Sequence, residues 1–169
     1  MKRSIRLYNV IFPIWLVLFF PPVILLTLVG NYIIDSLVLV ACFYAFRLSS
    51  TSLSLKKFYG NNIFLVWIYG FLADFIGAGI LFATGICGES MGLAYEATSA
   101  ICYDPMSHPL AVAIVVGSIL VSAFLIFLFN YKLVFARREE LNTIGFKIAV
   151  VFAIVTAPWT FLIPTKLFY

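Results

Sequence analysis

The chain has 169 residues, of which 64% are hydrophobic and 11% charged, and it carries a net charge of +4. A soluble domain is nearer half apolar and a quarter charged, so this chain has too few polar groups to cover a soluble surface. The composition therefore excludes an ordinary soluble domain and indicates an all-α bundle of transmembrane helices. The basic residues stand at the ends of apolar runs and form no basic-aromatic patch, which argues against a nucleic-acid partner.

The first apolar run extends over residues 7–48. A helix that crosses a bilayer needs about 20 apolar residues, so this run is too long for one crossing and suits two. Gly30-Asn31 is the best turn signal inside it. We therefore predict spans over residues 7–29 and 32–48.

Pro21-Pro22 offers an alternative turn, which would leave residues 7–20 as a short or re-entrant segment. A re-entrant segment would place Lys2 and Lys56 on opposite sides of the membrane, whereas two crossings place them on the same side. The charge pattern favours two crossings. The run also exceeds the apolar core of a signal peptide and lacks a cleavage site, so we expect it to be retained.

Three further apolar runs predict three more spans, and the chain then forms one transmembrane domain over residues 1–169. These spans cover residues 62–87, 110–131 and 144–163, with a polar loop at 88–109. Five crossings place the N-terminus and the C-terminus on opposite sides of the membrane.

The basic residues set the predicted orientation. With the N-terminus in the cytoplasm, ten of the eleven Lys and Arg residues lie on the cytoplasmic side: Lys2, Arg3, Arg6, Arg47, Lys56, Lys57, Lys132, Arg137, Arg138 and Lys147. The loop at 88–109 has no Lys or Arg but contains Glu89, Glu96 and Asp104, so it belongs outside.

Asp74 is a carboxyl group inside a predicted span. It lies twelve residues from Asn62, or about 18 Å into the membrane, where a carboxylate costs on the order of 3 kcal/mol. Small residues accompany it at helical spacing, and they allow a neighbouring helix to approach closely: Gly70, Ala73, Gly77 and Ala78, followed by Leu81. We therefore expect Asp74 to face the interior of the bundle.

Two roles for Asp74 stay open. It is either an ion- or proton-binding carboxylate, or a hydrogen-bonded residue that joins two helices. For the second role the partners would be Ser118 and Ser122, one turn apart on the fourth span, and Thr156 on the fifth. Asp35 lies one turn inside the outer end of the second predicted span, where a carboxylate caps free amides. Together, Asp35 and Asp74 could mark an acidic path from outside to the midplane.

The outer side also carries Cys87 and Cys102, and the predicted compartment permits a disulfide between them. Closing that loop would contribute about 3 kcal/mol. The spacing is not that of a dithiol redox site, and Cys42 is expected to pack within a span. His108 has Cys102 and Asp104 nearby, but no ligand set has metal-site spacing, so we expect no metal or cofactor. Residues 91–101 form either a short interfacial helix or an irregular cap.

Three segments of the chain resemble small uncharacterised multi-pass membrane proteins of Gram-positive bacteria. These segments are Gly70 to Gly77, Phe129-Asn130-Tyr131-Lys132, and Thr156-Ala157-Pro158 with Ile163-Pro164-Thr165. The resemblance extends over most of the chain. It implies a bacterial cell membrane and carries no activity with it.

Three classes of function fit these observations. The first, which we favour from sequence alone, is a non-catalytic subunit, assembly or immunity-type module that works through contacts with a membrane partner. The second is a small ion, proton or solute transporter or channel that uses Asp74, as a homo-oligomer. The third is a lipid-modifying enzyme, which would need clustered catalytic groups that the chain offers only in its outer loop without recognisable order. We expect no enzymatic activity.

Overall fold

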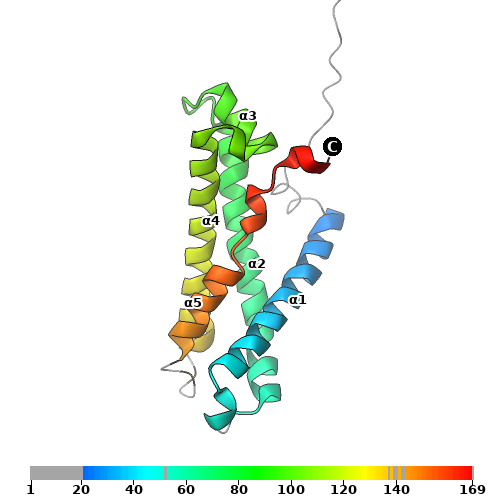
Figure 1. The fold of residues 1–169 in the computed structure, drawn as a ribbon, viewed down its shortest axis with the longest axis vertical. Coiled ribbons are helices and arrows are strands. Elements are labelled where there is room, and N and C mark those ends of the chain that lie inside the picture. Colours follow the sequence, from blue (N-terminus) through cyan, green and yellow to red (C-terminus); the bar gives the residue numbers. More distant parts are fainter. Residues whose placement is uncertain (1–20, 52, 137, 139–140, 142–143, 169) are drawn as a thin grey trace, which may run out of the picture.

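A computed structural model describes residues 21–51, 53–136, 138, 141 and 144–168, and most of these residues are helical with no strand among them (Figure 1). The α-helices are α1 (Pro21–Ala45), α2 (Leu55–Cys87), α3 (Tyr95–Tyr103), α4 (Pro109–Phe129) and α5 (Gly145–Val155). A π-helical segment, η4 (Asn130–Phe135), extends α4. Short 3-10 helices complete the chain: η2 (Leu48–Thr51), η3 (Pro105–Ser107), η6 (Trp159–Leu162) and η7 (Thr165–Phe168).

Four helical segments are long and apolar enough to cross a membrane: Ile24–Ala45, Leu55–Cys87, Pro109–Phe135 and Gly145–Leu162. Large apolar side chains such as Leu26, Phe64 and Phe124 are more than half exposed on the outside of the bundle. Lipid solvates such a surface, whereas water would not. The prediction of an all-α bundle with membrane-spanning helices is confirmed at this level. The number of crossings in the whole chain and the orientation stay predictions.

The predicted turn at Gly30-Asn31 is wrong, because α1 continues through both residues. Residue pairs that form turns in soluble proteins often continue a helix inside a bilayer. A broken helix there would leave backbone N–H and C=O groups without hydrogen-bond partners. The second predicted span, 32–48, falls largely on the second half of α1. Residues 7–20 lie outside the described residues, as does most of the first predicted span, and Pro21-Pro22 stands at the edge of the described part.

The other spans also differ from their predicted bounds. Helix α2 contains all of the predicted 62–87 but begins at Leu55, where the Ser54 hydroxyl accepts a hydrogen bond from Lys57 N at 3.3 Å. Its 33 residues extend for about 50 Å, more than the thickness of a hydrocarbon core, so its first turns project beyond it. The predicted span 144–163 is not one helix, since α5 ends at Val155 and the chain resumes as η6.

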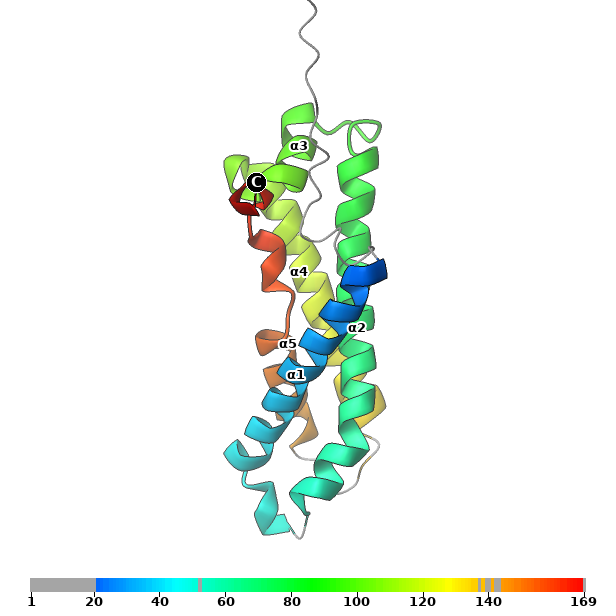
Figure 2. The ribbon, with the colours of Figure 1, turned by 90° about the vertical axis from the view of Figure 1, so that its right-hand side faces the viewer.

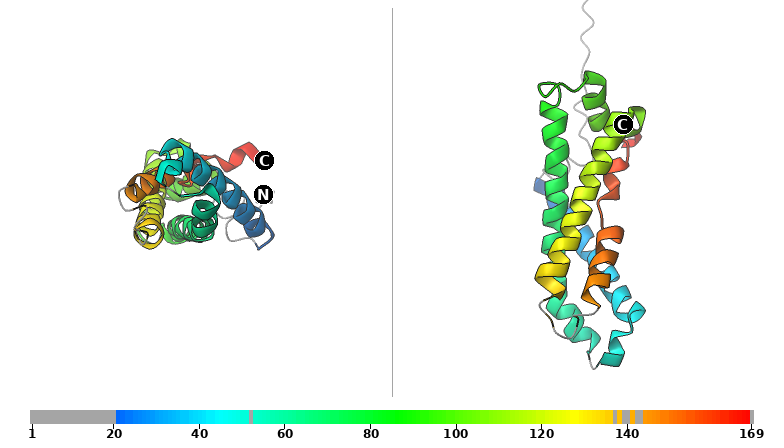
Figure 3. Two further views of the ribbon diagram at one scale, coloured as in Figure 1. Left: turned by 90° about the horizontal axis from the view of Figure 1, so that it is seen from below. Right: turned by 90° about the vertical axis from the view of Figure 1, so that its left-hand side faces the viewer.

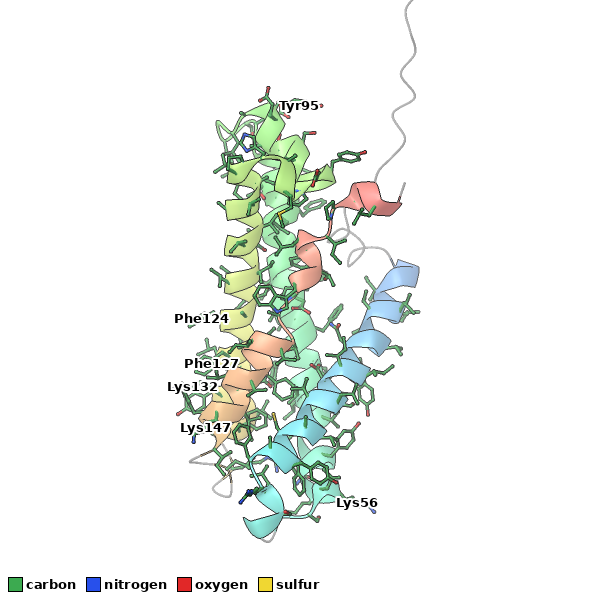
Figure 4. All side chains as sticks on the ribbon, in the orientation of Figure 1. Lys56, Tyr95, Phe124, Phe127, Lys132 and Lys147 are labelled. Carbon is green, nitrogen blue, oxygen red and sulfur yellow. The ribbon has the colours of Figure 1, made fainter. Side chains whose placement is uncertain are left out.

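Helix α2 lies between α4 and α1 (Figure 1), and α1 crosses it at an angle (Figure 2). Helix α5 packs on α4 and also contacts α1 (Figure 3). The short helix α3 covers one end of α2 and α4. A helix therefore forms in the predicted stretch 91–101, but only from Tyr95, and its position at a membrane interface stays a prediction. Lys56, Lys132 and Lys147 lie at the opposite end from Tyr95 of α3, and a basic end of this kind is typical of a cytoplasmic side (Figure 4).

The small residues of α2 allow it to approach α4 closely. The Ser118 hydroxyl donates to the Gly77 carbonyl at 2.7 Å, and the Ser122 hydroxyl donates to the Ala73 carbonyl at 3.1 Å. A Cβ atom at Gly77 would overlap the Ser122 Oγ. All members of the predicted stripe on α2, including Asp74, are buried, so the expectation that this face points inward is confirmed.

Polar contacts hold α1 to α2. The Tyr59 hydroxyl lies 3.0 Å from the Tyr32 hydroxyl and 2.9 Å from the Ser36 Oγ. The Trp67 indole N–H donates to the Leu28 carbonyl at 2.8 Å. Hydrogen bonds between helices stabilise membrane bundles by about 0.6 kcal/mol on average, so these contacts add to packing without replacing it.

We predict that Gly77→Ala lowers stability by about 1–3 kcal/mol, because the new methyl group must displace the Ser122 hydroxyl from its hydrogen bond. Gly79→Ala is the matched control, since nothing lies within 4 Å of its Cβ position. Thermal unfolding of the purified proteins in detergent measures the stability of both variants. Adding Ser122→Ala removes the obstructing hydroxyl and should shrink the penalty. An unchanged penalty in that background would contradict this account of the contact.

Candidate functional site

A cavity of about 300 Å³ lies between α1, α2 and the segment that joins α5 to η6. Its polar wall residues come from all three elements: Thr27, Asn31 and Asp35 from α1, Asp74 from α2, and Thr156 and Thr160 from the joining region. None of the residues that line it is Lys or Arg. Two carboxyl groups therefore share one cavity, within the described residues, with no basic side chain in its wall.

Asp74 enters this cavity from the middle of α2. Its side chain is 8% exposed. One carboxyl oxygen, Oδ2, accepts a long hydrogen bond of 3.4 Å from the Asn31 amide, and the other, Oδ1, is buried without a hydrogen-bond partner. Buried polar atoms are nearly always hydrogen-bonded, and leaving one unpaired costs about 1–3 kcal/mol. An unsatisfied carboxyl oxygen at a cavity is thus suited to a proton or a cation that arrives from elsewhere.

Asp35 approaches the same cavity from α1, and it is 3% exposed. A glycine faces it on α2: a Cβ atom at Gly70 would lie 3.5 Å from the Asp35 Oδ2. The predicted capping role of Asp35 is wrong, because α1 extends well before this residue and its first-turn amides lie elsewhere. The continuous helix instead places Asp35 one turn after Asn31, on the face that lines the cavity.

The cavity's third wall is a helix break. Pro158 has no backbone N–H, so the Ile154 carbonyl loses its helical donor, and the Trp159 indole N–H donates to that carbonyl at 2.9 Å instead. The Trp159 backbone N–H donates to the Ala157 carbonyl at 2.7 Å, so the Val155 carbonyl also lacks its helical donor. Irregular backbone at membrane depth is tolerated where it is buried in protein or lines a cavity, as this segment does.

The structure separates two of the three predicted partners of Asp74 from it. Ser118 and Ser122 bind backbone carbonyls of α2 and do not line the cavity, so their predicted bond to the carboxyl is wrong. Thr156 lines the cavity, although its hydroxyl donates to the Phe152 carbonyl at 2.8 Å.

Sequence reasoning overlooked Asn31 as a site residue because it was assigned to a turn. Its spacing of four residues from Asp35 was the available signal.

The outer-loop residues lie apart from this cavity, at the end capped by α3. Cys87 is exposed and Cys102 half-buried, both as free thiols, and the disulfide between them stays a prediction. The His108 Nδ1 accepts from Leu110 N at 3.2 Å and caps α4. Among the described residues, no three His, Cys, Asp or Glu side chains form a group that would hold a metal ion.

The chain matches no protein-family model, no curated protein and no solved structure. The chemistry of the cavity therefore follows from its own residues. Two buried carboxyls, a side-chain amide, three threonine hydroxyls and an interrupted helix supply oxygen atoms of the kind that bind cations or hold protons. They include no sulfur or imidazole ligand for a transition metal.

We predict that Cys87 reacts with N-ethylmaleimide before Cys102 at neutral pH. Burial raises the pKa of the Cys102 thiol, so at a given pH a smaller fraction of it is the reactive thiolate. The labelling rate of Cys102 should continue to rise at alkaline pH. Mass spectrometry of partially labelled protein, with Cys87→Ser as control, measures the order. Labelling of both residues only after reduction would confirm the predicted disulfide and contradict this order of reaction.

Proposed function

We propose that this chain is a small membrane transporter that exchanges protons for a cation at the Asp35–Asp74 cavity, in the cell membrane. The observation that carries the proposal is that Asp74, whose Oδ1 is buried and unpartnered, lines one cavity together with a second carboxyl. The lining residues that the structure describes all belong to one chain, and a homo-oligomer stays a prediction.

The electrostatics of the cavity support exchange. A buried carboxylate needs a compensating charge or a proton, since its transfer out of water costs several kcal/mol. Among the described residues the wall has no Lys or Arg, and the Asn31 amide donates to Asp74. The Asp35 carboxyl, Thr156 and Thr160 line the same cavity. Neutrality therefore depends on protons or on cations from solution, and each can displace the other.

The structure also removes one support for the module that the sequence favoured. The small-residue stripe on α2 suits the close approach of a partner helix, but α4 of the same chain occupies it. The exposed outer face consists of large apolar side chains such as Leu25, Phe64 and Ile154, which suit lipid. A polar cavity inside the bundle has no role in a module that works through its outer surface.

We expect Asp74→Asn to abolish cation-driven proton flux while the protein stays folded. Asparagine preserves the size of the side chain and can still bind Asn31, but it can neither exchange a proton nor carry a charge. The assay uses proteoliposomes that contain a trapped pH-sensitive dye, to which sodium, potassium and tetramethylammonium are added in turn. The proton flux of the variant should be at least tenfold lower than that of the wild type, at the level of protein-free liposomes.

Glu96→Gln is the matched control, since it removes an exposed carboxyl on α3 far from the cavity. Its flux should equal that of the wild type. The thermal midpoint of every variant in detergent reports the fold independently of flux. Wild-type protein that moves no tested cation, or an Asp74→Asn protein with full flux, would refute the proposed function.

A further inference from the structure

A second hollow adjoins the carboxyl cavity. This apolar groove has a volume of about 190 Å³ and is lined by Val38, Ala41 and Ala45 of α1 and by Val151 and Val155 of α5, among others. Val155 belongs to the walls of both hollows. The two therefore lie side by side along the contact between α1 and α5.

The spacing of residues on α1 places the two hollows in one line. Asn31, Asp35, Val38 and Ala45 follow at intervals of three, four or seven residues, which keeps them on a single face of a helix. From Asp35 to Ala45 this face extends for about 15 Å. The part of this face at Asn31 and Asp35 is polar and acidic, and the part at Val38 and Ala45 is apolar.

The groove is open to the outside of the bundle, between two of the segments that are apolar enough to cross a membrane. Val155 is 52% exposed, and Ala41 and Ala45 are exposed as well. The α1 span is also the least buried of the four spans. A molecule dissolved in the bilayer could thus reach the groove from the side, between α1 and α5.

We propose that the cation bound by this protein is an amphipathic organic monocation. Its charged head lies between Asp35 and Asp74, and its alkyl tail lies in the groove along α1 and α5. The inference rests on the proposed function. Charge complementarity selects the head, since the described residues of the first cavity's wall include two carboxyls and no basic group. The apolar walls of the second hollow select the tail.

The sizes of the hollows favour a small molecule over a bilayer lipid. Sites for small ligands have volumes of about 300–1,000 Å³, and the two hollows, of about 300 and 190 Å³, together fall near the lower end of that range. A two-chain phospholipid is larger than both together. Its phosphate would also bring a negative charge towards the carboxyls, which repel it.

The test is a chain-length series in the proteoliposome assay, with trimethylammonium ions that carry a methyl, butyl, hexyl or octyl group. For the wild type, the half-saturating concentration should fall by up to about fourfold for each CH₂ that enters the groove. Ala41→Phe fills the groove without touching the carboxyl cavity. This variant should transport tetramethylammonium as the wild type does and lose most of the dependence on chain length.

Ala113→Phe is the matched control, because Ala113 is exposed on α4 and lines neither hollow. Its dependence on chain length should equal that of the wild type. Because the longer ions partition into lipid equally for every variant, comparison with this control corrects for that effect. If Ala41→Phe shows the same dependence on chain length as the wild type, or if only inorganic cations are moved, the amphipathic ligand is refuted while the proposed function stands. If no cation is moved, both fail together.

Discussion

The contact between α2 and α4 at Gly77 determines where every other part of the site lies. The hydroxyls of Ser118 and Ser122 bind the carbonyls at Gly77 and Ala73, and the absent side chain of Gly77 leaves room for them. Small residues and interhelical hydrogen bonds are the main sources of helix association in lipid, where apolar side chains gain nothing by leaving the bilayer for one another. With α2 held in this way, Asp74 points towards α1 and the break after α5, away from lipid.

Three irregular features of the bundle lie around the cavity. The Asp74 Oδ1 has no partner, Asp35 lies beside Gly70, and the helix of the fourth described span is broken at Pro158. The Trp159 indole repairs one of the freed carbonyls. Each of these features alone is tolerable in a membrane protein. Their presence around one cavity is the reason for assigning the site a role in binding.

Local pattern was enough to predict that Asp74 faces the interior, because its small neighbours recur at three- and four-residue spacing and all are buried. It was not enough for Asp35. Its predicted role as a helix cap assumed a turn at Gly30-Asn31, which the bilayer environment does not favour. Neither the cavity nor the contact of Ser122 with Ala73 could be predicted, since both join segments far apart in the sequence. Proline at position 158 was visible, but whether it bends a helix or ends it is decided by packing.

The pairing of two carboxyls has a consequence for coupling in the proposed transporter. In a medium of low dielectric constant, two like charges close together are strongly disfavoured, so the pair releases its protons one at a time. A monocation can replace one proton and leave the second in place, and the cavity then has the same net charge in both states. Exchange of one proton for one monocation is electrically silent, so a gradient of pH alone would drive it. A single carboxyl would also permit such exchange, but after releasing its proton it would have no second acid group to donate a hydrogen bond to the bare carboxylate. Asp35 is a second acid group in the wall of the same cavity, and the missing side chain of Gly70 leaves room beside its carboxyl.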